Sequence, residues 1–436
     1  MKNEIIIREN GILGEKYYKI RHTSGLDIYV FPKKLSTAYA LFATRYGASD
    51  NCFRLEGDAE FTTVPDGIAH FLEHKMFENE DGSDAFNQYA ATGANANAFT
   101  SSQTTAYLFS CTENFEESLG VLLDMVTHPY FTEKTVQKEQ GIIAQEIRMG
   151  EDNPSRALYY GMIRSLYSEN HIRINVAGTV ESIAEINAEL LYRCYEVFYN
   201  LHNMALFICG DVTPESVIAV ADAHLEIAPP MKIERRENPE PAEIAQKRFL
   251  RKMQVAKPLF AIGIKDTDIS PDPAQRMRRQ CVMDILNEIL FSRSSSLRNA
   301  LYEEGLIGAS LSYGYGVCDT HSYSSISGES KDPEEVYSRI WAYIRAMQES
   351  GVDSAAFERC KRVIYADCVA SYDDTSEIAH ALMDMVFDDE ELFDEPEAIA
   401  SVTVEDVNNL LRTVFNEEKA VMAVVAPISD GEEENA

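Results

Sequence analysis

Hydrophobic and polar positions follow two different periods along the first half of the chain. Stretches that alternate, or that are apolar throughout, predict strands at residues 25–31, 38–47, 94–110 and 204–209. Apolar residues spaced three and four apart predict helices at residues 67–77, 83–92, 115–126, 132–147, 155–167 and 183–199. A further helix is expected from Thr213-Pro214, because proline is favoured in the first helical turn.

The second half of the chain repeats part of this pattern. The predicted helix at 333–347 matches the one at 115–126, and the helix at 354–369 matches the one at 134–147. Within the second pair the apolar positions keep a constant offset, as in Val136 and Phe357, Ile142 and Val363, and Ile143 and Ile364. At the same offset Glu139 falls on Cys360 and Glu146 on Asp367. We interpret the chain as a duplication.

A proline-rich stretch separates the two halves. Residues 228–241 hold four prolines and the charged run Glu-Arg-Arg-Glu, which is typical of a semi-extended linker. We predict domains at residues 1–227 and 246–436, joined by a linker at 228–245. The second-half segment 282–291 occupies the place of the helix at 67–77 and has no histidine. We therefore expect only the first half to keep the polar residues for chemistry.

The helix predicted at 67–77 carries the main chemical motif, His-Phe-Leu-Glu-His at residues 70–74. In a helix His70 and His74 share one face, so both imidazoles can reach a single metal ion. Glu73 lies beside them without the spacing of a ligand, where a general base is needed. The preceding residues 62–66 favour helix initiation. The pattern H-x-x-E-H is that of the inverzincin zinc peptidases, although a polar helix face can also carry these residues.

A catalytic zinc site needs a third protein ligand, which the helix at 132–147 offers. Glu146 lies among three isoleucines, where a carboxylate is costly unless it is paired or coordinated. Glu139 is two turns earlier on the same face and is placed to orient a histidine N–H. The alternative is a solvated helix whose glutamates pair with nearby lysines and arginines.

The composition excludes several classes of protein. The net charge of −32 makes nucleic acid and anionic membrane surfaces poor partners. The acidic stretches at 387–397 and 430–436 are interpreted as a solvated loop and a frayed terminus. Because the chain has no apolar run long enough for a signal peptide or a membrane span, a cytoplasmic location is expected. The eight cysteines, without a C-x-x-C pair, are expected to be reduced core thiols.

Several segments together resemble the pitrilysin/insulinase family of zinc metallopeptidases. Residues 67–74 resemble its G-x-A-H-x-x-E-H motif, residues 94–100 its N-A-x-T segment, and residues 142–146 the segment of its distal ligand glutamate. Residues 176–183 and 203–211 resemble two further family segments. The likeness covers nearly the whole chain and points to the short-chain branch that includes mitochondrial processing peptidase.

The resemblance implies both a fold and a metal site. The fold would be α+β, with two duplicated α/β-sandwich domains that form one half of a clamshell. Each domain would be a mostly antiparallel sheet with helices on one face. The cofactor would be zinc, held by His70, His74 and Glu146. Glu73 would be the catalytic base, supported by Glu139.

The resemblance also implies where a peptide substrate binds. Asn97 and Ala98 would lie on an edge strand to which the peptide adds as an extra strand. The gap between the motif and Glu146 is a few residues shorter than is usual in the family, which a trimmed loop would absorb.

The second half departs from the family pattern. Active members with one complete site usually carry an arginine and a tyrosine in a segment like L-R-x-x-x-G-L-x-Y, which contact the substrate. Here Tyr302 stands in place of the arginine and Gly308 near the tyrosine. Tyr313 and Tyr315 follow shortly afterwards and are candidates for the missing contacts.

These departures lead to a hypothesis about partners and activity. The chain would be a zinc endopeptidase for short or unfolded peptides, and a related zinc-less subunit would complete it, as in the bacterial peptidase-like pair associated with elongation factor P modification. A homodimer is the competing assembly. The alternative function is a non-catalytic assembly or maturation subunit of the same family. The intact set of His70, Glu73, His74 and Glu146 favours the enzyme.

Overall fold

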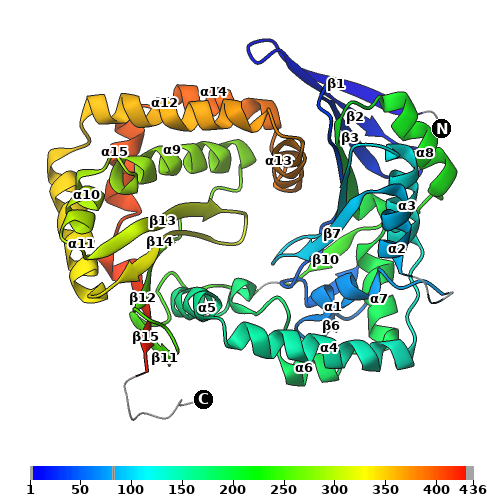
Figure 1. Ribbon diagram of the computed structural model, residues 1–436, viewed down its shortest axis with the longest axis horizontal. Coiled ribbons are helices and arrows are strands. Elements are labelled where there is room, and N and C mark those ends of the chain that lie inside the picture. Colours follow the sequence, from blue (N-terminus) through cyan, green and yellow to red (C-terminus); the bar gives the residue numbers. More distant parts are fainter. Residues whose placement is uncertain (1–2, 81, 83, 237, 429–436) are drawn as a thin grey trace. The chain divides into compact units, whose positions relative to one another are not determined.

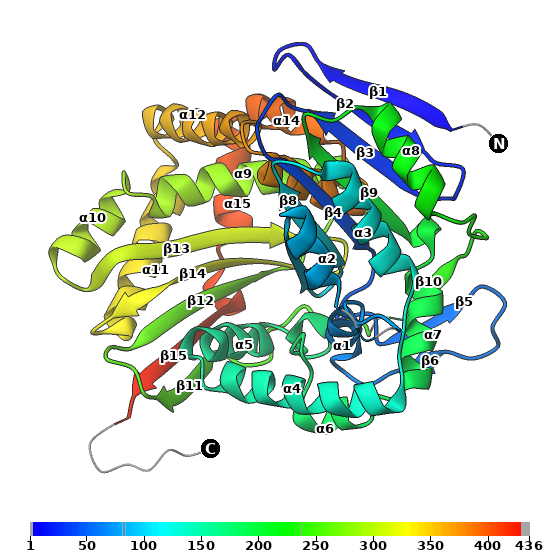
Figure 2. The ribbon, with the colours of Figure 1, turned by 45° about the vertical axis from the view of Figure 1, so that its right-hand side comes forward.

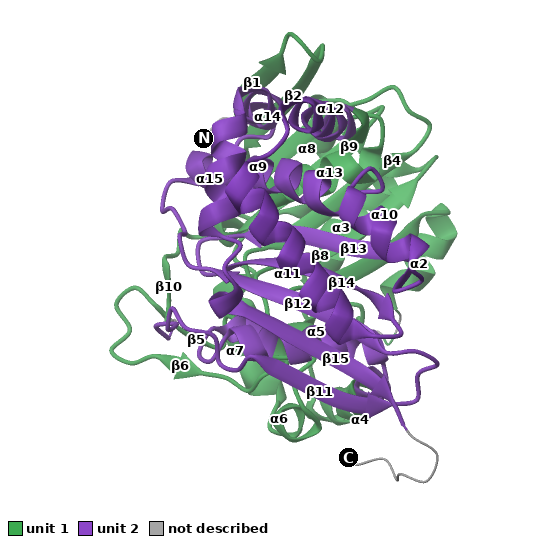
Figure 3. Cartoon of the chain, turned by 90° about the vertical axis from the view of Figure 1, so that its left-hand side faces the viewer, with its two compact units in different colours: residues 1–147, 174–237, 370–387 green, residues 148–173, 238–369, 388–436 purple. Residues whose placement is uncertain are grey.

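The computed structural model describes residues 3–80, 82, 84–236 and 238–428. The chain divides into two compact units, which Figure 3 colours separately. Unit 1 comprises residues 1–147, 174–237 and 370–387, and unit 2 comprises residues 148–173, 238–369 and 388–436. The acidic stretch at 430–436, which the sequence predicts to be frayed, lies outside the described residues.

Unit 1 is built on a mostly antiparallel sheet with the strand order β1-β2-β3-β9-β4-β8-β7 (β7 is labelled in Figure 1 and the other strands in Figure 2). The neighbours β3 and β9 are parallel, whereas the other adjacent pairs are antiparallel. The strands are β1 (Glu4–Asn10), β2 (Glu15–Arg21), β3 (Asp27–Pro32), β4 (Ala38–Thr44), β7 (Asn95–Thr100), β8 (Thr105–Cys111) and β9 (Met204–Gly210). A small second sheet joins β10 (Ile233–Arg235), β5 (Cys52–Leu55) and β6 (Thr62–Thr63).

One face of this sheet carries a layer of helices. The helices of unit 1 from the first half of the chain are α1 (Ile68–Lys75), α2 (Ala85–Thr92), α3 (Phe115–Thr127), α4 (Glu133–Glu151), α6 (Val180–Ala184), α7 (Ala188–Phe198) and α8 (Pro214–His224). Figures 1 and 2 show α3 and α8 side by side on this face. Alternate strand residues such as Val30, Phe42 and Ile208 point into the core beneath these helices.

The opposite face of the same sheet is covered by α13 (Thr375–Phe387), which comes from the second half of the chain. Its Phe387 ring packs edge-on against Phe207, and His380 is hydrogen-bonded to the Tyr39 hydroxyl at 3.0 Å. Because both faces are covered, β4 and β9 are buried almost throughout rather than in alternation. The predicted helix layer on one face is therefore present, with one additional helix on the other.

Unit 2 repeats the same topology. Its sheet has the order β11-β15-β12-β14-β13, in which β11 and β15 are parallel and the other neighbours antiparallel. This order matches β3-β9-β4-β8-β7 of unit 1, strand for strand. The strands are β11 (Arg248–Met253), β12 (Leu259–Asp266), β13 (Ile307–Val317), β14 (Ser322–Ser330) and β15 (Ala420–Pro427). The duplication predicted from the sequence is therefore present in the fold.

The helices of unit 2 follow in the corresponding order. They are α9 (Pro273–Phe291), α10 (Ser296–Glu303), α11 (Pro333–Ser350), α12 (Ser354–Ser371), α14 (Glu395–Ser401) and α15 (Val404–Thr413), together with α5 (Pro154–Leu166) from the first half. Helix α5 packs on β11, β12 and β15, as α13 packs on the equivalent strands of unit 1. A side chain at Gly263 in β12 would collide with Met162 and Leu166 of α5, so glycine permits this close approach.

The domain prediction therefore differs from the structure. The division between residues 237 and 238 falls inside the predicted linker at 228–245, but each unit also takes one helix from the other half of the sequence. The amphipathic pattern of a helix shows that one face is buried, and it carries no information on which sheet buries it. Within the predicted linker, residues 233–235 form β10 and pair with β5.

The motif helix α1 begins differently from the sequence prediction. Residues 62–63 form strand β6, and the residue before α1 is Gly67 in a left-handed conformation with φ of 91°, without a side-chain cap. A Cβ atom at Gly67 would lie 2.6 Å from the carbonyl oxygen of Ala177. Glycine is therefore required here both for the dihedral angle and for contact with the segment before α6.

Two further sequence expectations can be compared with the structure. The helix predicted at 183–199 is two helices, because the Asn187 side chain caps the start of α7 at the Leu190 amide. Seven of the eight cysteines are buried, which agrees with the prediction that they lie in the core, and Cys52 is partly exposed. Within the described residues, we find no helix with the length and apolar character that crossing a bilayer requires.

Replacing Leu166 by alanine tests the assignment of α5 to unit 2. Leu166 is fully buried with Ala261, Val421 and Ala423. The free energy of unfolding should fall by about 2–5 kcal/mol because a cavity is left in that core. In hydrogen exchange, the amides of β12 and β15 should lose protection. Met149→Ala, at a residue that is 74% exposed, is the control. Loss of protection confined to the sheet of unit 1 would contradict the assignment.

Candidate metal centre

Two helices of unit 1 bring three of the predicted ligands together. His70 and His74 lie on one face of α1, with ring centroids 4.6 Å apart. Glu146 comes from α4. Its Oε1 atom lies 3.5 Å from His70 Nε2, and its Oε2 atom lies 3.6 Å from His74 Nε2. One ligand atom from each residue lies within 4.8 Å of the other two.

These distances fit a metal ion better than direct hydrogen bonds. At 3.5 and 3.6 Å, the nitrogen and oxygen atoms are farther apart than in ordinary N–H···O hydrogen bonds. Two ligand atoms bound to zinc at tetrahedral angles, each about 2.0–2.2 Å from the ion, are roughly 3.3–3.6 Å apart. Two imidazoles and one carboxylate also match the donor set of catalytic zinc sites. The residues present therefore fit zinc.

Glu139 holds the second histidine in place. Its Oε1 atom lies 2.9 Å from His74 Nδ1. A carboxylate accepts hydrogen bonds, so Nδ1 donates and Nε2 is left to face Glu146. Burial alone would lower the pKa of His74, but the hydrogen bond to Glu139 and the surrounding carboxylates outweigh it and raise that pKa. Glu139 therefore lies on the side of the His74 ring away from Glu146, where a carboxylate can orient the ring.

Glu73 projects from the same helix toward β7. Its side chain is buried, and its Oε2 atom accepts a 2.6 Å hydrogen bond from the hydroxyl of Thr100. Burial raises the pKa of Glu73, while the hydrogen bond from Thr100 and the neighbouring His74 oppose that shift. Glu73 is therefore held beside the histidines by a contact with the sheet, in the position expected of a base.

The predicted substrate residues of the first half lie on β7, the last strand in the order of the unit 1 sheet. Asn97 is opposite Leu108 and Ala98 is opposite Tyr107 on the inner neighbour β8. The Asn97 side chain is exposed, and its Oδ1 atom accepts the Ala98 backbone N–H at 2.9 Å. An added strand would have to displace this local hydrogen bond.

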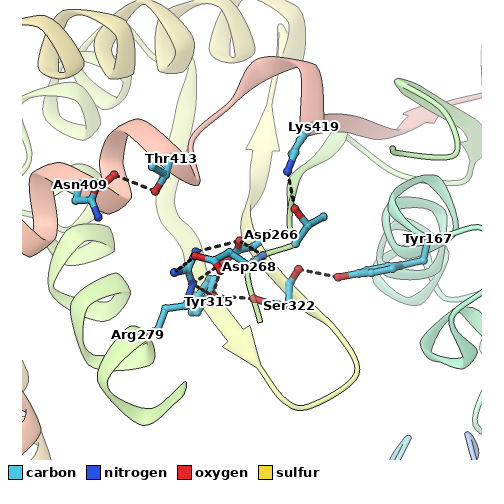
Figure 4. A network of polar contacts seen from close by, with 10 residues as sticks. Tyr167, Asp266, Asp268, Arg279, Tyr315, Ser322, Asn409, Thr413 and Lys419 are labelled. Atoms are coloured by element: carbon cyan, nitrogen blue, oxygen red, sulfur yellow. Dashed lines mark hydrogen bonds and ion pairs between the residues drawn. The ribbon is translucent and has the colours of Figure 1, made fainter. Parts of the chain in front are cut away.

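Tyr313 and Tyr315 belong to unit 2 and already have hydrogen-bond partners there. Tyr313 donates to Glu288 at 2.8 Å. The buried hydroxyl of Tyr315 donates to Asp266 at 2.7 Å and accepts from Ser322, in the network drawn in Figure 4. Arg279 completes that network through Asp266, at 2.8 Å. Their role as substrate contacts remains a prediction, and the engaged hydroxyl of Tyr315 does not support it.

Three residues that contribute to the site had no functional prediction from the sequence. Thr100 lies in the segment at 94–100, but its bond to Glu73 depends on how β7 lies against α1. Gly67 and Gly178 let the segment before α6 pack against the start of α1, since a Cβ at Gly178 would lie 2.4 Å from the Asp66 carbonyl oxygen. Both glycines have a positive φ, which explains why glycine occupies these positions in the two segments that resemble the family.

Comparison with protein-family models matches most of the chain. The model described as Insulinase (Peptidase family M16) matches residues 61–180, which contain α1 and α4. The model described as Peptidase M16 inactive domain matches residues 185–364. The first model therefore covers the candidate metal centre, and the second begins just before α7 and extends into α12.

Similar proteins and structures agree with this assignment. A Bacillus subtilis protein named uncharacterized zinc protease YmfH is 39% identical over 96% of this chain and 98% of its own length. The crystal structure of an M16-like peptidase from Alicyclobacillus acidocaldarius is 32% identical, with a TM-score of 0.90 over 98% of this chain and 99% of that chain. Pitrilysin, at 16% identity and a TM-score of 0.74, shares the fold over 97% of this chain and 46% of that chain. The chain belongs to the insulinase family of peptidases, family M16.

Proposed function

We propose that the chain is a zinc-dependent endopeptidase that cleaves short or unfolded peptides. The observation that carries this proposal is the convergence of His70, His74 and Glu146 at distances suited to one ion, with the carboxylate of Glu73 beside them. Membership of the insulinase family and the zinc-protease names of its relatives support the reaction class.

Each residue of the centre has a separate task in this proposal. Zinc held by the three ligands would act as a Lewis acid toward the peptide carbonyl and would make water more acidic. Glu73 takes a proton from the attacking water, whose oxygen bonds to the carbonyl carbon. When the C–N bond breaks, Glu73 returns the proton to the leaving nitrogen. Thr100 keeps the carboxylate oriented, and Glu139 keeps the His74 ring oriented.

The position of β7 supports an extended peptide as the substrate. It is the terminal strand of its sheet and carries both Thr100, which contacts Glu73, and the exposed Asn97. A peptide added antiparallel or parallel to this edge would gain backbone hydrogen bonds irrespective of its sequence. Its scissile bond would then lie near Glu73. Most backbone N–H and C=O groups of a folded protein are already paired, which favours short or unfolded substrates.

Replacing Glu73 by glutamine should separate metal binding from catalysis. The variant should bind zinc in the same stoichiometry as the wild type, because Glu73 is not a ligand in this proposal. Peptide hydrolysis should fall by about 10²–10⁴-fold, since proton transfer is lost. The measurements are metal content by mass spectrometry and cleavage of a quenched fluorescent peptide. Equal cleavage by the variant would remove Glu73 from its role, and a wild type that binds zinc without any hydrolysis would favour the assembly function.

Replacing Glu139 by alanine should weaken zinc binding by about 10–100-fold, because His74 loses the acceptor that fixes its ring. The readout is competition with a chromogenic zinc chelator. Glu151→Ala, at an exposed glutamate near the end of the same helix, is the matched control and should leave zinc affinity unchanged. Equal affinities for wild type and Glu139→Ala would show that the ring is oriented by other contacts.

We further propose that a related zinc-less chain completes the enzyme, because Tyr302 and Gly308 replace the arginine and tyrosine that complete members carry. The purified chain alone should then cleave peptides slowly, and a candidate partner chain should increase kcat/KM by at least about tenfold. Light scattering coupled to chromatography identifies the complex. Robust turnover by the chain alone, as a homodimer, would refute the need for a second protein.

A further inference from the structure

Unit 2 contains a cavity at the place that corresponds to the metal centre of unit 1. The metal centre lies between α1, the edge strand β7 and α4. In the repeated topology the equivalent elements are α9, β13 and α12. These three elements, together with the start of α14, line an open cavity of about 230 Å³. All the residues that line it belong to unit 2.

The polar residues that line this cavity repeat the spacing of the zinc motif. Asp284, Asn287 and Glu288 are spaced i, i+3 and i+4 on α9, as are His70, Glu73 and His74 on α1. Asp367 of α12 also lines the cavity, and the repeat in the sequence pairs it with Glu146. Each position of the H-x-x-E-H set and the distal glutamate is thus occupied in unit 2 by a side chain with oxygen atoms.

The packing around α9 supports the same correspondence. In unit 1 the residues just before α6 lie against Gly67, three positions before His70. In unit 2, α14 packs against α9, and its first residue, Glu395, lines the cavity together with Asp284. In both units a segment that comes after the long helix, α4 or α12, therefore lies against the motif helix.

Asn287 shows that the cavity is built for a polar ligand. Its side chain is 2% exposed and lines the cavity. Neither its Oδ1 nor its Nδ2 atom has a hydrogen-bond partner among the residues that the structure describes. A buried amide without partners costs about 1–3 kcal/mol, so its retention in an otherwise apolar helix core calls for a group that binds it.

The charged residues that line the cavity indicate the sign of the charge on that ligand. Four carboxylates line it, from Asp284, Glu288, Asp367 and Glu395, and none of the lining residues is a lysine, arginine or histidine. Burial raises the pKa of Asp284 to about 7 and also raises that of Glu395. A cation placed among them would offset this unfavourable burial of negative charge.

The geometry favours an organic cation over a metal ion. Within the described part of the chain, the group of ligand atoms that lie within 4.8 Å of one another is His70, His74 and Glu146, and the four carboxylates of the cavity do not form a second one. The volume of about 230 Å³ is several times the roughly 30 Å³ that one water occupies in the liquid. Asp367 is exposed, so the cavity reaches the protein surface.

We propose that this cavity of unit 2 binds an alkylguanidinium or alkylammonium group, the cationic group that arginine and lysine side chains share with free polyamines. Asp284 and Glu288 would accept hydrogen bonds from the cation, and Asp367 would meet it at the entrance. Asn287 would accept a further hydrogen bond through Oδ1. The proposal does not depend on peptidase activity, because it concerns residues of the other unit.

Isothermal titration calorimetry on the full, zinc-loaded chain tests this proposal with agmatine as the probe. Agmatine should bind at a single site, and Glu288→Gln combined with Asp367→Asn should weaken it at least tenfold. Glu397→Gln, at an exposed glutamate of α14, is the matched control for a general loss of negative charge and should bind as the wild type does. Wild-type protein that binds no agmatine would overturn the proposal.

A second variant distinguishes loss of cation binding from loss of folding. Asn287→Leu replaces the unsatisfied amide by an apolar group of similar size, so the unliganded protein should melt at the same temperature as the wild type or higher. Its melting temperature should no longer rise with agmatine. If Asn287→Leu binds agmatine as tightly as the wild type, the cation lies elsewhere and the proposal fails.

A pair of peptides distinguishes a cationic side chain of a peptide from a free small cation as the ligand. In the Glu73→Gln background, which prevents cleavage, a capped pentapeptide with a central arginine is compared with its citrulline analogue. Binding of the arginine peptide, at least tenfold tighter than the citrulline peptide and sensitive to Asn287→Leu, identifies peptide side chains as ligands. Binding of agmatine without the peptide identifies free small cations. Binding of Mg²⁺, Ca²⁺ or Mn²⁺ that Asn287→Leu abolishes, with no binding of agmatine, would instead establish a metal site and refute the proposal.

Discussion

The hydrogen bond between His74 Nδ1 and Glu139 decides which edge of the His74 ring faces Glu146. It requires α4 to lie beside α1 in one register, so that glutamates two helical turns apart reach the same histidine from two sides. That register is held by packing, because Val136, Ile143 and Ile147 are buried in the core of unit 1. The placement of Glu139 and Glu146 therefore depends on an apolar stripe whose residues are not part of the candidate centre.

The local part of this arrangement could be predicted from the sequence. The spacing of His70 and His74 places both on one helix face whatever the rest of the fold does. The position of Glu146 could be predicted only in part. Of the three isoleucines around it, Ile143 and Ile147 are buried, whereas Ile142 is 46% exposed, and the Glu146 side chain itself is 41% exposed. The prediction from an apolar context therefore holds only in part. The contact between Thr100 and Glu73 was beyond prediction, because it depends on the distance between a strand and a helix that are separated by α2.

The duplication shows a limit of comparing sequence halves at one offset. The matched positions of α4 and α12 are 221 residues apart, whereas His70 and Asp284 are 214 apart. Glu288 and Asp367 are 79 residues apart, whereas His74 and Glu146 are 72 apart. The segment between the two helices is therefore seven residues longer in unit 2, and no single offset aligns both helices. The segment at 282–291 has no histidine, but it carries polar side chains at the spacing of the motif. Asp284, Asn287 and Glu288 occupy the place of the motif, with oxygen atoms instead of imidazoles.

The reciprocal placement of α5 and α13 has a consequence for biosynthesis. A ribosome makes the chain from the N-terminus, yet the sheet of unit 1 receives its last helix only at residues 375–387. Until then the aromatic face formed by Tyr29 and Phe207 has no covering helix in its own unit. The sheet of unit 2 likewise lacks β15 until residues 420–427 have been made, although α5 of the same unit is synthesised much earlier. Both cores are therefore completed only after segments of the second half have been synthesised, so neither half of the chain holds a complete core on its own.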